Sequence, residues 1–598
     1  MKLSWTRFWS ICVACTLIFG AVGVQMVRIQ NIPGSQQILD QSQAYQGVTQ
    51  TIYPERGNIY DAGGRLLAGN ETIYEVGLDL ASIDQPETIA AVVSSVLGMD
   101  YLKVLEYAKL TPGGNNPIYI TLDGFVDKDK VEQLEIIDQE YRTREVARGQ
   151  IRPKLTGLMW TPHNKRSYPE GELGSNILGF YSYLDRTEGA GYFGVEESYN
   201  QLLAGTPKKV YTAFDPQKIE SAEPVPPGAS LVLTIDREIQ AMTENTLDEA
   251  LDWSGAKSGT ILVYNPEDGG IIAMANSPRM DPNNYWTYSE VFPNPTPFNT
   301  AVSETYEPGS VFKVVSLAAG LDSDAFEPET RFNDTGSIYV GGYYINNWNG
   351  GAWGDVDMTE CMQHSLNVCL AWMAEEIGPD RFYSYMRAFG IDRNTGIDLG
   401  GETHWPMKVP GDNQWYEIDL ATNSFGQGIS VTPIQMVTAI GALANDGKMM
   451  APHVVKAMII DGHQYDVKPV IIGNPIKAET AQTVTHMLVN SLEQESSNAL
   501  VEGYSLAGKT GTAEIPTELG YTSSVTNVSF VGWGPSEDPK FLVYIWLQEP
   551  RVSIWGSEVA APVFSQLVDK LVVLMNIPPD DVRLANVKSP ERELSQTE

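Results

Sequence analysis

The first apolar segment of the chain is long enough to cross a membrane. Residues Phe8 to Val27 include no charged side chain, and Lys2 and Arg7 precede them. A helix needs about 20 apolar residues to span hydrocarbon, and basic flanks tend to stay in the cytoplasm. We therefore expect residues 1–29 to form a cytoplasmic stub and a single-pass transmembrane anchor, with the rest extracytoplasmic. A cleaved signal peptide, cut near Ala21-Val22-Gly23, is the alternative, but its apolar core is usually only about 7–15 residues long.

The next part of the chain has a mixed pattern. Residues 30–50 are polar and predict a stalk, whereas residues 51–220 alternate short β-like stretches with charged helical ones. Within them, Arg56 to Leu67 predicts two strands joined at a Gly-Gly turn, and Lys128 to Arg148 predicts a helix. The Pro-rich segment Ser221 to Gly228 predicts a domain boundary. Taken alone, residues 51–220 suggest an interaction or spacer module.

Two groups of apolar strands follow this boundary, far apart in the chain. Gly259–Tyr264 and Ile271–Ala275 flank Asp268-Gly269-Gly270, which is a hairpin signal. Phe530–Trp533 and Phe541–Leu547 form the second group. The shared pattern of short, strongly apolar runs separated by Gly or Pro predicts buried strands.

A helical insert, Val311 to about Asn498, separates the two strand groups, and a helical pattern from Glu558 to Met575 follows the second. One antiparallel sheet covered by helices, with the insert as a helical lobe, buries both groups most simply. We therefore expect an α/β (α+β) multidomain fold, with residues 221–577 as one domain and a cleft between lobe and sheet. Residues 578–598 are charged and Pro-containing, which predicts a disordered tail.

Composition excludes several classes of function. Lys and Arg number 40 against 75 Asp and Glu, a net charge of −35, so we expect no nucleic-acid partner. Cys12 and Cys15 lie in the apolar segment, and Cys361 and Cys369 lie eight positions apart in helix-like sequence. At about 1.5 Å of rise per residue that separation disfavours a bridge, so buried thiols are predicted. No metal-ligand spacing or Ser-His-Asp pattern is present, and no cofactor is implied.

The first motif that suggests catalytic chemistry is Ser310-Val311-Phe312-Lys313, at the start of an apolar run. On a helix, Ser310 and Lys313 share a face, and the break at Glu307-Pro308-Gly309 places the serine at a helix N-terminus. To accept a proton, Lys313 must lose its charge through burial or a nearby cation, because a free lysine has a pKa of about 10.4. Ser254-Gly255-Ala256-Lys257 matches the same pattern but leads into a strand, which separates its side chains.

The second motif is Ser365-Leu366-Asn367, between two predicted helices, Met358–His364 and Val368–Ile377. A short exposed turn there would present a hydroxyl for proton relay and an amide for a substrate. Ser496-Ser497-Asn498 is a decoy of the same form without this helical setting.

The third motif, Lys509-Thr510-Gly511-Thr512, has two interpretations. Gly503 to Thr510 also fits the phosphate-binding pattern G-x-x-x-x-G-K-[ST], which makes a P-loop NTPase the remote alternative. A P-loop needs a helix after the motif, and the sequence through Pro516 is a poor helix start. As a strand edge, the segment offers backbone N–H groups, a glycine that lets a ligand approach, and hydroxyls with an ammonium for a carboxylate.

With the three motifs in this order, the chain resembles the class B penicillin-binding proteins, the monofunctional peptidoglycan D,D-transpeptidases, in a form similar to the division-associated FtsI or PBP3 branch. One departure is Ala62, where the family's pedestal motif has arginine after Asp61. The matching segments are Arg56–Asp61, Arg166–Pro169 and Gly194–Glu196 in the pedestal, or dimerisation, domain (51–220), and Thr234–Gln240, Phe298–Lys313, Gly396–Leu399 and Ser424–Pro433 in the transpeptidase domain (221–577).

The resemblance implies a mechanism. Ser310, helped by Lys313, would attack the penultimate D-Ala carbonyl of a stem peptide, and β-lactams would acylate the same serine. By the same resemblance, Ser365 and Lys509 would pass protons, Asn367 would position the amide, the amides of Ser310 and Thr512 would form the oxyanion hole, and Thr510 with Thr512 would hold the terminal carboxylate.

The resemblance also implies partners. These are stem peptides on a lipid-linked precursor polymer, an FtsW-type membrane glycosyltransferase and other cell-wall or division proteins. A D,D-carboxypeptidase or a β-lactam-hydrolysing or β-lactam-sensing serine acyltransferase is the main alternative. The predicted anchor and pedestal favour the transpeptidase, since a hydrolase needs neither.

Overall fold

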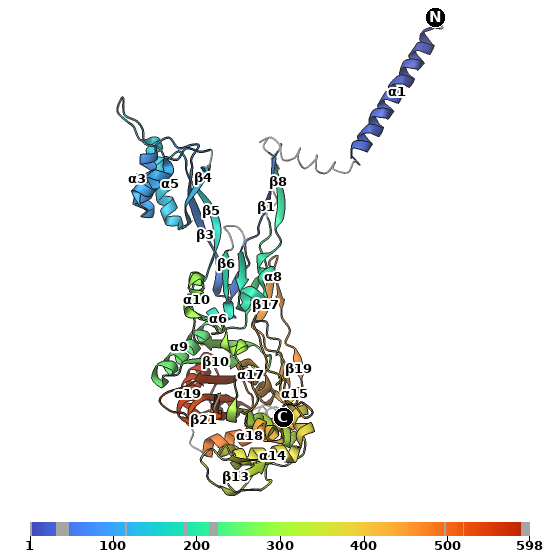
Figure 1. Cartoon of the computed structure of the whole chain (residues 1–598), viewed down its shortest axis with the longest axis vertical. Helices are drawn as coiled ribbons and strands as arrows, with labels where there is room; N and C mark the ends of the chain where they lie inside the picture. Colours follow the sequence, from blue (N-terminus) through green and yellow to red (C-terminus); the bar gives the residue numbers. More distant parts are fainter. Residues whose placement is uncertain are drawn as a thin grey trace, which may run out of the picture. The chain divides into compact units, whose positions relative to one another are not determined.

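The computed structural model describes residues 3–30, 47–113, 116–183, 189–213, 225–494, 498–517 and 520–587 (Figure 1). They belong to two units, residues 1–55 with 204–228, and residues 56–203 with 229–598. The predicted boundary around residue 220 and the middle of the predicted stalk lie outside the described residues.

The first unit contains the N-terminal helix and a two-stranded ribbon. Helix α1 spans Leu3–Gln30, and its segment Phe8–Arg28 has a mean hydropathy of 2.1. Among the described helices it alone is long and apolar enough to cross a membrane. Strand β1 (Gly47–Ile52), which takes up the end of the predicted stalk, pairs antiparallel with β8 (Lys208–Ala213).

The second unit begins with the predicted hairpin. β2 (Ile59–Tyr60) and β3 (Leu66–Asp79) pair antiparallel around a turn at Gly64, so the predicted strand–turn–strand is confirmed. β3 also pairs with β4 (Tyr119–Val126) and β5 (Leu158–Ser167). The helices that share a core with these strands are α3 (Pro86–Leu97), α4 (Tyr101–Ala108) and α5 (Lys128–Thr143).

A buried ionic cluster joins three segments of this unit, at Arg56, Arg166 and Glu196. Glu196 accepts hydrogen bonds from Nε of Arg56 and Nε of Arg166, each at 2.7 Å. Burial alone would raise the pKa of Glu196, but the two guanidinium groups hold it below its ordinary value. Short elements surround the cluster: α6 (Ser175–Leu178), β6 (Phe180–Tyr183), β7 (Gly189–Tyr192), α7 (Gly194–Ser198) and α8 (Asn200–Ala204).

The sheet that starts at β2 and β3 continues into the C-terminal part of the chain. Its order is β18-β17-β9-β2-β3-β4, and β2 runs parallel to β9 (Ser230–Leu233), with Ile59 opposite Leu231. β17 (Val455–Ile460) and β18 (His463–Asp466) complete it. The two predicted domains therefore share one sheet.

The second sheet has the order β11-β10-β22-β21-β20 and is antiparallel throughout. Its strands are β10 (Ser258–Tyr264), β11 (Ile271–Asn276), β20 (Ala507–Thr517), β21 (Gly520–Gly534) and β22 (Phe541–Gln548). Both predicted strand groups thus meet in one sheet, as expected. Alternate residues of β22 enter different cores, for example Val543 in one and Tyr544 in the other, because successive side chains point to opposite faces.

Helices cover both faces of this sheet (Figure 1). α9 (Arg237–Ser254) and α19 (Gly556–Leu574) share a core with one face. α12 (Lys313–Asp322), α17 (Pro433–Gly441) and α18 (Ala478–Gln494) belong to the larger core that includes the other face. The predicted C-terminal helix corresponds to α19.

The insert is helical only in part, which corrects the prediction for residues 311–498. β17 and β18 come from it and extend the first sheet; in β17 the buried Val455 and Ala457 flank the exposed Lys456, as the alternation of a strand requires. The insert's remaining helices are α13 (Met358–Gln363), α14 (Asn367–Ile377), α15 (Pro379–Ala388), α16 (Glu417–Ser424) and η4 (Leu443–Asn445). Its short strands are β12 (Phe332–Asp334), β13 (Ser337–Val340), β14 (Tyr343–Asn346), β15 (Gly354–Val356), β16 (Met449–Met450) and β19 (Ile471–Gly473).

The predicted disordered tail, residues 578–598, is also corrected in part. Helix α20 spans Asp580–Val587. Asp580 accepts a hydrogen bond from the Ser505 amide at 2.7 Å, and Arg583 pairs with Glu537 and Asp580 at 2.8 Å. These polar contacts fix the segment without a large apolar face, which explains why composition alone suggested disorder. Residues 588–598 lie outside the described part.

Candidate active site

Ser310 lies on a tight turn that leads into a buried helix. The turn is the 3₁₀ helix η3 (Gly309–Phe312), and α12 continues it from Lys313. Gly309 has φ +59°, and a Cβ there would lie 2.7 Å from the carbonyl oxygen of Thr512. Its amide donates to the carbonyl of Gly426 at 3.0 Å. Glycine is therefore required where the turn passes between strand β20 and the loop at Gly426.

Lys313 is fully buried one turn further along. Its Nζ donates hydrogen bonds to the Ser365 carbonyl at 2.7 Å, to Ser365 Oγ at 3.1 Å and to Asn367 Oδ1 at 2.8 Å. Burial, and secondarily the positive charge of Lys509, lower the pKa of Lys313 well below its ordinary value. Three donated bonds correspond to the charged form of the lysine. The uncharged amine keeps two N–H donors for the Ser365 carbonyl and Asn367 Oδ1, and its lone pair can then accept a proton from a hydroxyl, which lets a lysine act as a base.

Ser365 and Asn367 occupy the turn between α13 and α14. Ser365 has φ +53°, a left-handed conformation that is uncommon for a residue with a side chain. Asn367 is the first residue of α14, and its Nδ2 donates to the carbonyl of Asn346 at 3.3 Å. The predicted short turn between two helices is confirmed, and this turn forms hydrogen bonds with Lys313.

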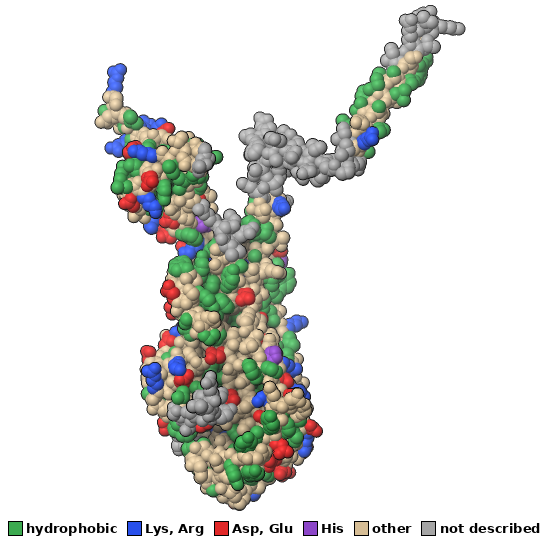
Figure 2. Space-filling view, viewed as in Figure 1, with side chains coloured by type: hydrophobic (Ala, Val, Ile, Leu, Met, Phe, Trp, Pro, Cys, Tyr) green, Lys and Arg blue, Asp and Glu red, His purple; other side chains and the backbone are tan. Residues whose placement is uncertain are grey.

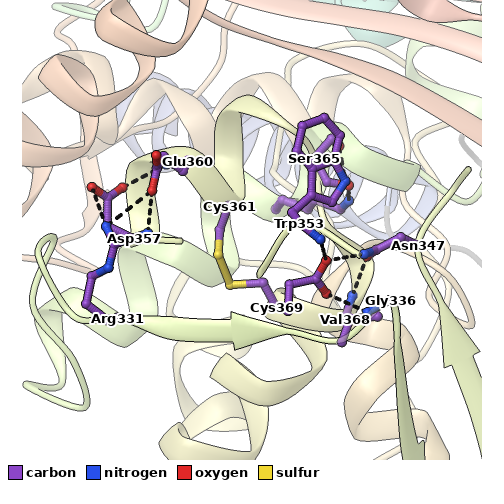
Figure 3. Close-up of a disulfide and its surroundings, with 12 residues drawn as sticks. Arg331, Gly336, Asn347, Trp353, Asp357, Glu360, Cys361, Ser365, Val368 and Cys369 are labelled. Carbon is purple, nitrogen blue, oxygen red and sulfur yellow. Dashed lines mark hydrogen bonds and ion pairs between the residues drawn. A yellow bond between two sulfur atoms is a disulfide. The ribbon is translucent and has the colours of Figure 1, made fainter. Parts of the chain in front are cut away.

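The cysteines beside this turn are not free thiols, contrary to the prediction. Cys361 of α13 and Cys369 of α14 form a disulfide with a Cα–Cα distance of 6.1 Å (Figure 3). The prediction assumed one continuous helical axis, but the chain reverses at Ser365, so residues eight positions apart come close. Cys12 and Cys15 remain free.

The third motif lies on β20, next to the Ser310 turn. A Cβ on Gly511 would lie 2.9 Å from Val311 Cγ1 and 2.1 Å from Ser529 Oγ, so the strand and the turn are in close contact. Lys509 is buried, and its Nζ donates to the Thr510 carbonyl at 3.2 Å. Thr512 Oγ1 accepts a hydrogen bond from the amide of Gly556 at 3.0 Å.

The three motifs therefore converge, although Ser310 and Lys509 lie 199 positions apart in the chain. Lys313 bonds directly to the second motif, and Lys509 is near enough to influence its charge. Thr510 and Thr512 are partly exposed, whereas Lys509 and Gly511 are buried, which matches the alternation of a strand. The register of β20 with β21 shifts only beyond the motif, between Glu514 and Ile515.

Comparison with known proteins places this arrangement in a family. The family model "Penicillin binding protein transpeptidase domain" matches residues 259–569, more than half of the chain. A second, "Penicillin-binding Protein dimerisation domain", matches residues 51–233. The chain is a class B penicillin-binding protein.

Individual relatives support this assignment. The chain is 30% identical over 537 residues to stage V sporulation protein D of Bacillus subtilis, covering 86% of this chain and 77% of that one. It is 27% identical to peptidoglycan D,D-transpeptidase FtsI of Buchnera aphidicola, covering 89% of each. A crystal structure of penicillin binding protein 3 from Mycobacterium tuberculosis in complex with aztreonam superposes with a TM-score of 0.66 at 25% identity, covering 89% of this chain and 98% of that one.

The decoy motifs of this penicillin-binding protein lack the local structure that their chemistry would need. Ser254 ends α9, and Lys257 forms an ion pair with Glu549. Gly503 to Thr510 runs into strand β20 rather than a helix, so the P-loop interpretation is wrong. Ser496 and Ser497 lie outside the described residues, and the side chain of Asn498 bonds to the Ser557 carbonyl.

Sequence reasoning missed the residues that support the Ser365 turn. Asn347 Oδ1 accepts from the Val368 amide at 3.2 Å, and its Nδ2 donates to the buried carboxylate of Asp334 at 2.8 Å. Trp348 Nε1 donates to the His364 carbonyl at 3.1 Å, and the ring of Trp353 stacks on His364. The density of Tyr and Trp between residues 339 and 353 was the available signal, but nothing in it pointed to Ser365.

Proposed function

We propose that this class B penicillin-binding protein is a peptidoglycan D,D-transpeptidase in cell-wall synthesis and that it acts through an acyl-enzyme on Ser310. The buried Lys313 is the observation on which the proposal depends: it lies one helical turn after Ser310, and its contacts with Ser365 and Asn367 hold its amine in the site. The family and the FtsI relative support the same activity.

The first half of the reaction is acylation. Uncharged Lys313 accepts the proton of Ser310 Oγ while the oxygen attacks the penultimate D-Ala carbonyl of a donor stem peptide. The amides of Ser310 and Thr512 receive the developing oxyanion, a kind of donor whose loss typically costs about 10²–10³ in rate. A proton then passes through Ser365 and Lys509 to the leaving nitrogen, and terminal D-Ala departs.

Strand β20 would hold the substrate during this step. Thr512 Oγ1 accepts from the Gly556 amide, which leaves its own proton available to a substrate carboxylate. Thr510 offers a second hydroxyl, and Gly511 lets the substrate backbone approach the strand. Asn367 would position an amide of the stem peptide.

The second half of the reaction transfers the acyl group. An amine of a second stem peptide attacks the acyl-enzyme, releases Ser310 and leaves a cross-link. β-Lactams acylate the same serine because they mimic the D-Ala-D-Ala end.

We also propose that α1 anchors the protein in the cell membrane with the second unit outside. Its apolar segment is long enough, and Arg7 precedes it. That location gives access to lipid-linked precursor polymer and to an FtsW-type glycosyltransferase. The sequence of residues 424–433 resembles the division-associated branch of the family, which favours a role in septum synthesis.

On the face shown in Figure 2, Lys and Arg side chains are scattered among Asp and Glu rather than gathered into a basic patch, which supports a partner other than nucleic acid.

A fluorescent penicillin tests the chemical core of this proposal. The wild-type protein should be labelled covalently and Ser310→Ala should not. The decoy variant Ser254→Ala serves as the control and should be labelled as well as the wild type. Labelling that persists in Ser310→Ala would refute the assignment of the nucleophile.

A second experiment separates the transpeptidase from a carboxypeptidase. With a D-Ala-D-Ala stem peptide and a second peptide that bears a free amine, the transpeptidase yields a cross-linked dimer and D-Ala. Release of D-Ala without dimer, at every amine concentration, would favour the hydrolase instead.

A further inference from the structure

The Cys361–Cys369 disulfide brackets the Ser365 turn symmetrically. One cysteine lies four positions before Ser365 and the other four positions after it, and both are 0% exposed. Figure 3 shows the bond joining α13 to α14 between two groups of hydrogen-bonded residues, one with Arg331 and the other with Asn347. The bond therefore ties together the two helices that enter and leave the turn.

Each helix is also fixed at its own start. Asp357 caps α13, and Glu360 completes a capping box with it. Arg331 bonds to this pair, with Nη1 at 3.3 Å from Glu360. On the other side, Asn347 accepts from the amide of Val368, the second residue of α14. These contacts set where each helix begins, whereas the disulfide sets the separation of the two helices beside the turn.

The turn itself has a conformation that needs such support. Ser365 holds φ +53°, which a residue with a Cβ adopts only when its surroundings impose it. Two of the three acceptors around Lys313 Nζ are atoms of this residue, and the third belongs to Asn367. A relaxation of Ser365 would therefore move the whole acceptor set of Lys313.

We propose that the Cys361–Cys369 disulfide is a positioning element of the acyl-transfer reaction, which holds the Ser365–Asn367 turn against Lys313. This inference rests on the proposed function of the same site. The two cysteines touch no substrate; they act through the turn.

The loss of the disulfide has a consequence that a purely structural bond would lack. The turn also covers Lys313, so its displacement admits water to Nζ. Burial is the main reason for the low pKa of Lys313 and the charge of Lys509 the second, so hydration moves that pKa toward its ordinary value. The base is then charged at neutral pH, and acylation needs a higher pH.

The test compares the full-length, detergent-solubilised wild type with a double variant, Cys361→Ala with Cys369→Ala. The rate constant for acylation by a fluorescent penicillin is measured as a function of pH. In the double variant we expect the rate at neutral pH to fall by about 10-fold to 100-fold, as small displacements of catalytic groups do. We also expect its pH profile to shift to higher pH. The matched control, Cys12→Ala with Cys15→Ala, changes the free cysteines and should reproduce the wild type.

Reduction of the wild type gives a second measurement that does not depend on whether the double variant folds. A phosphine breaks the S–S bond, takes one oxygen atom from water as its oxide and leaves two thiols. The reduced protein, verified by mass, should show the same shift of the pH profile, and reoxidation should reverse it. The double variant should not respond to the phosphine.

Two outcomes would overturn the inference. An acylation rate and pH profile equal to those of the wild type would show that the bond is irrelevant to the reaction. A slower rate with an unshifted profile and a lower melting temperature would assign the disulfide a structural role only. Either result leaves the labelling of Ser310 intact. Failure of the oxidised wild type to be labelled at all would instead refute the proposed function.

Discussion

In the proposed reaction, the charge of one side chain, Lys313, decides whether Ser310 can be activated. The lysine lies in the core with three hydrogen-bond acceptors around Nζ, and its pKa is lowered first by burial and then by Lys509. A lysine with a lowered pKa is neutral over a wider range of pH, and acylation should increase as pH rises through that value.

Replacement of Lys313 tests its role as a base. Lys313→Met keeps most of the buried volume and removes the amine, so we expect a folded protein with acylation reduced by about 10²–10⁴, the usual contribution of a general base. The decoy Lys257→Met, which changes a surface ion pair, should leave acylation unchanged. The rate of fluorescent penicillin labelling measures both. A rate for Lys313→Met equal to the wild type would remove this lysine from the mechanism.

Lys509 should shift the pH dependence in a defined direction. Its positive charge disfavours protonation of Lys313, so Lys509→Gln should raise the pKa of Lys313. The rising part of the acylation–pH profile should then move to higher pH. Lys540→Gln, which affects only a surface pair with Asp538, is the control. A profile that stays in place or moves to lower pH would show that Lys509 does not act on Lys313 through its charge.

The sequence was sufficient for the identity of these residues but not for their contacts. Ser310 and Lys313 could be paired in advance because three positions on a helix share a face. The bonds from Lys313 to Ser365 and Asn367 depend on how the insert folds back, which no local pattern encodes. Asp334 and Asn347 carry no motif at all; the structure alone shows that Asn347 accepts from the Val368 amide and that Asp334 accepts from Asn347.

Strand β20 and the Ser310 turn pack so closely at Gly511 that no side chain fits between them. Gly511 is the point of closest approach, since a Cβ there would lie 2.1 Å from Ser529 Oγ and 2.9 Å from Val311 Cγ1. The glycine is therefore as much a requirement of the packing as of substrate access.

Gly511→Ala should consequently separate the strand from the turn. We expect a loss of about 1–3 kcal/mol in the free energy of unfolding, typical of overpacking, together with slower acylation. Gly124→Ala is the control, because nothing lies within 4 Å of its Cβ position. Chemical unfolding and penicillin labelling report the two effects. An unchanged stability and labelling rate for Gly511→Ala would contradict the close packing described here.

The disulfide shows why prediction of the helices alone was insufficient to pair the cysteines. The sequence predicted two helices with a turn at Ser365, yet the distance between Cys361 and Cys369 was judged along a single helical axis. The reversal of the chain at the turn brings their Cα atoms to 6.1 Å. Likewise, β17 was overlooked within the insert because its partner strand, β9, lies more than 200 residues away in sequence.

At the scale of the whole molecule, one buried carboxylate connects distant segments of the chain. Glu196 binds both Arg56, which precedes β2, and Arg166, near the end of β5, and its side chain is 0% exposed. The sheet that includes β2 continues through β9 into the part that carries the candidate catalytic motifs. Stability of the pedestal region and integrity of the sheet should therefore be linked.

Glu196→Gln tests this link. The change leaves two buried arginines without their counter-charge, which typically costs about 3–5 kcal/mol in the free energy of unfolding. The control Glu238→Gln disrupts only an exposed pair with Arg65, worth at most about 1 kcal/mol. Thermal unfolding of the detergent-solubilised chain compares them. Equal melting temperatures for the two variants would show that the buried cluster contributes no more than a surface pair.

The most direct measurement of the central claim is mass spectrometry of the wild-type protein after reaction with a penicillin. A single covalent adduct with the mass of the intact β-lactam, mapped by peptide fragmentation to Ser310, is the predicted result. An adduct on any other residue, or a protein of unchanged mass, would contradict the convergence of Ser310, Lys313, Ser365 and Lys509 into one acyl-transfer site.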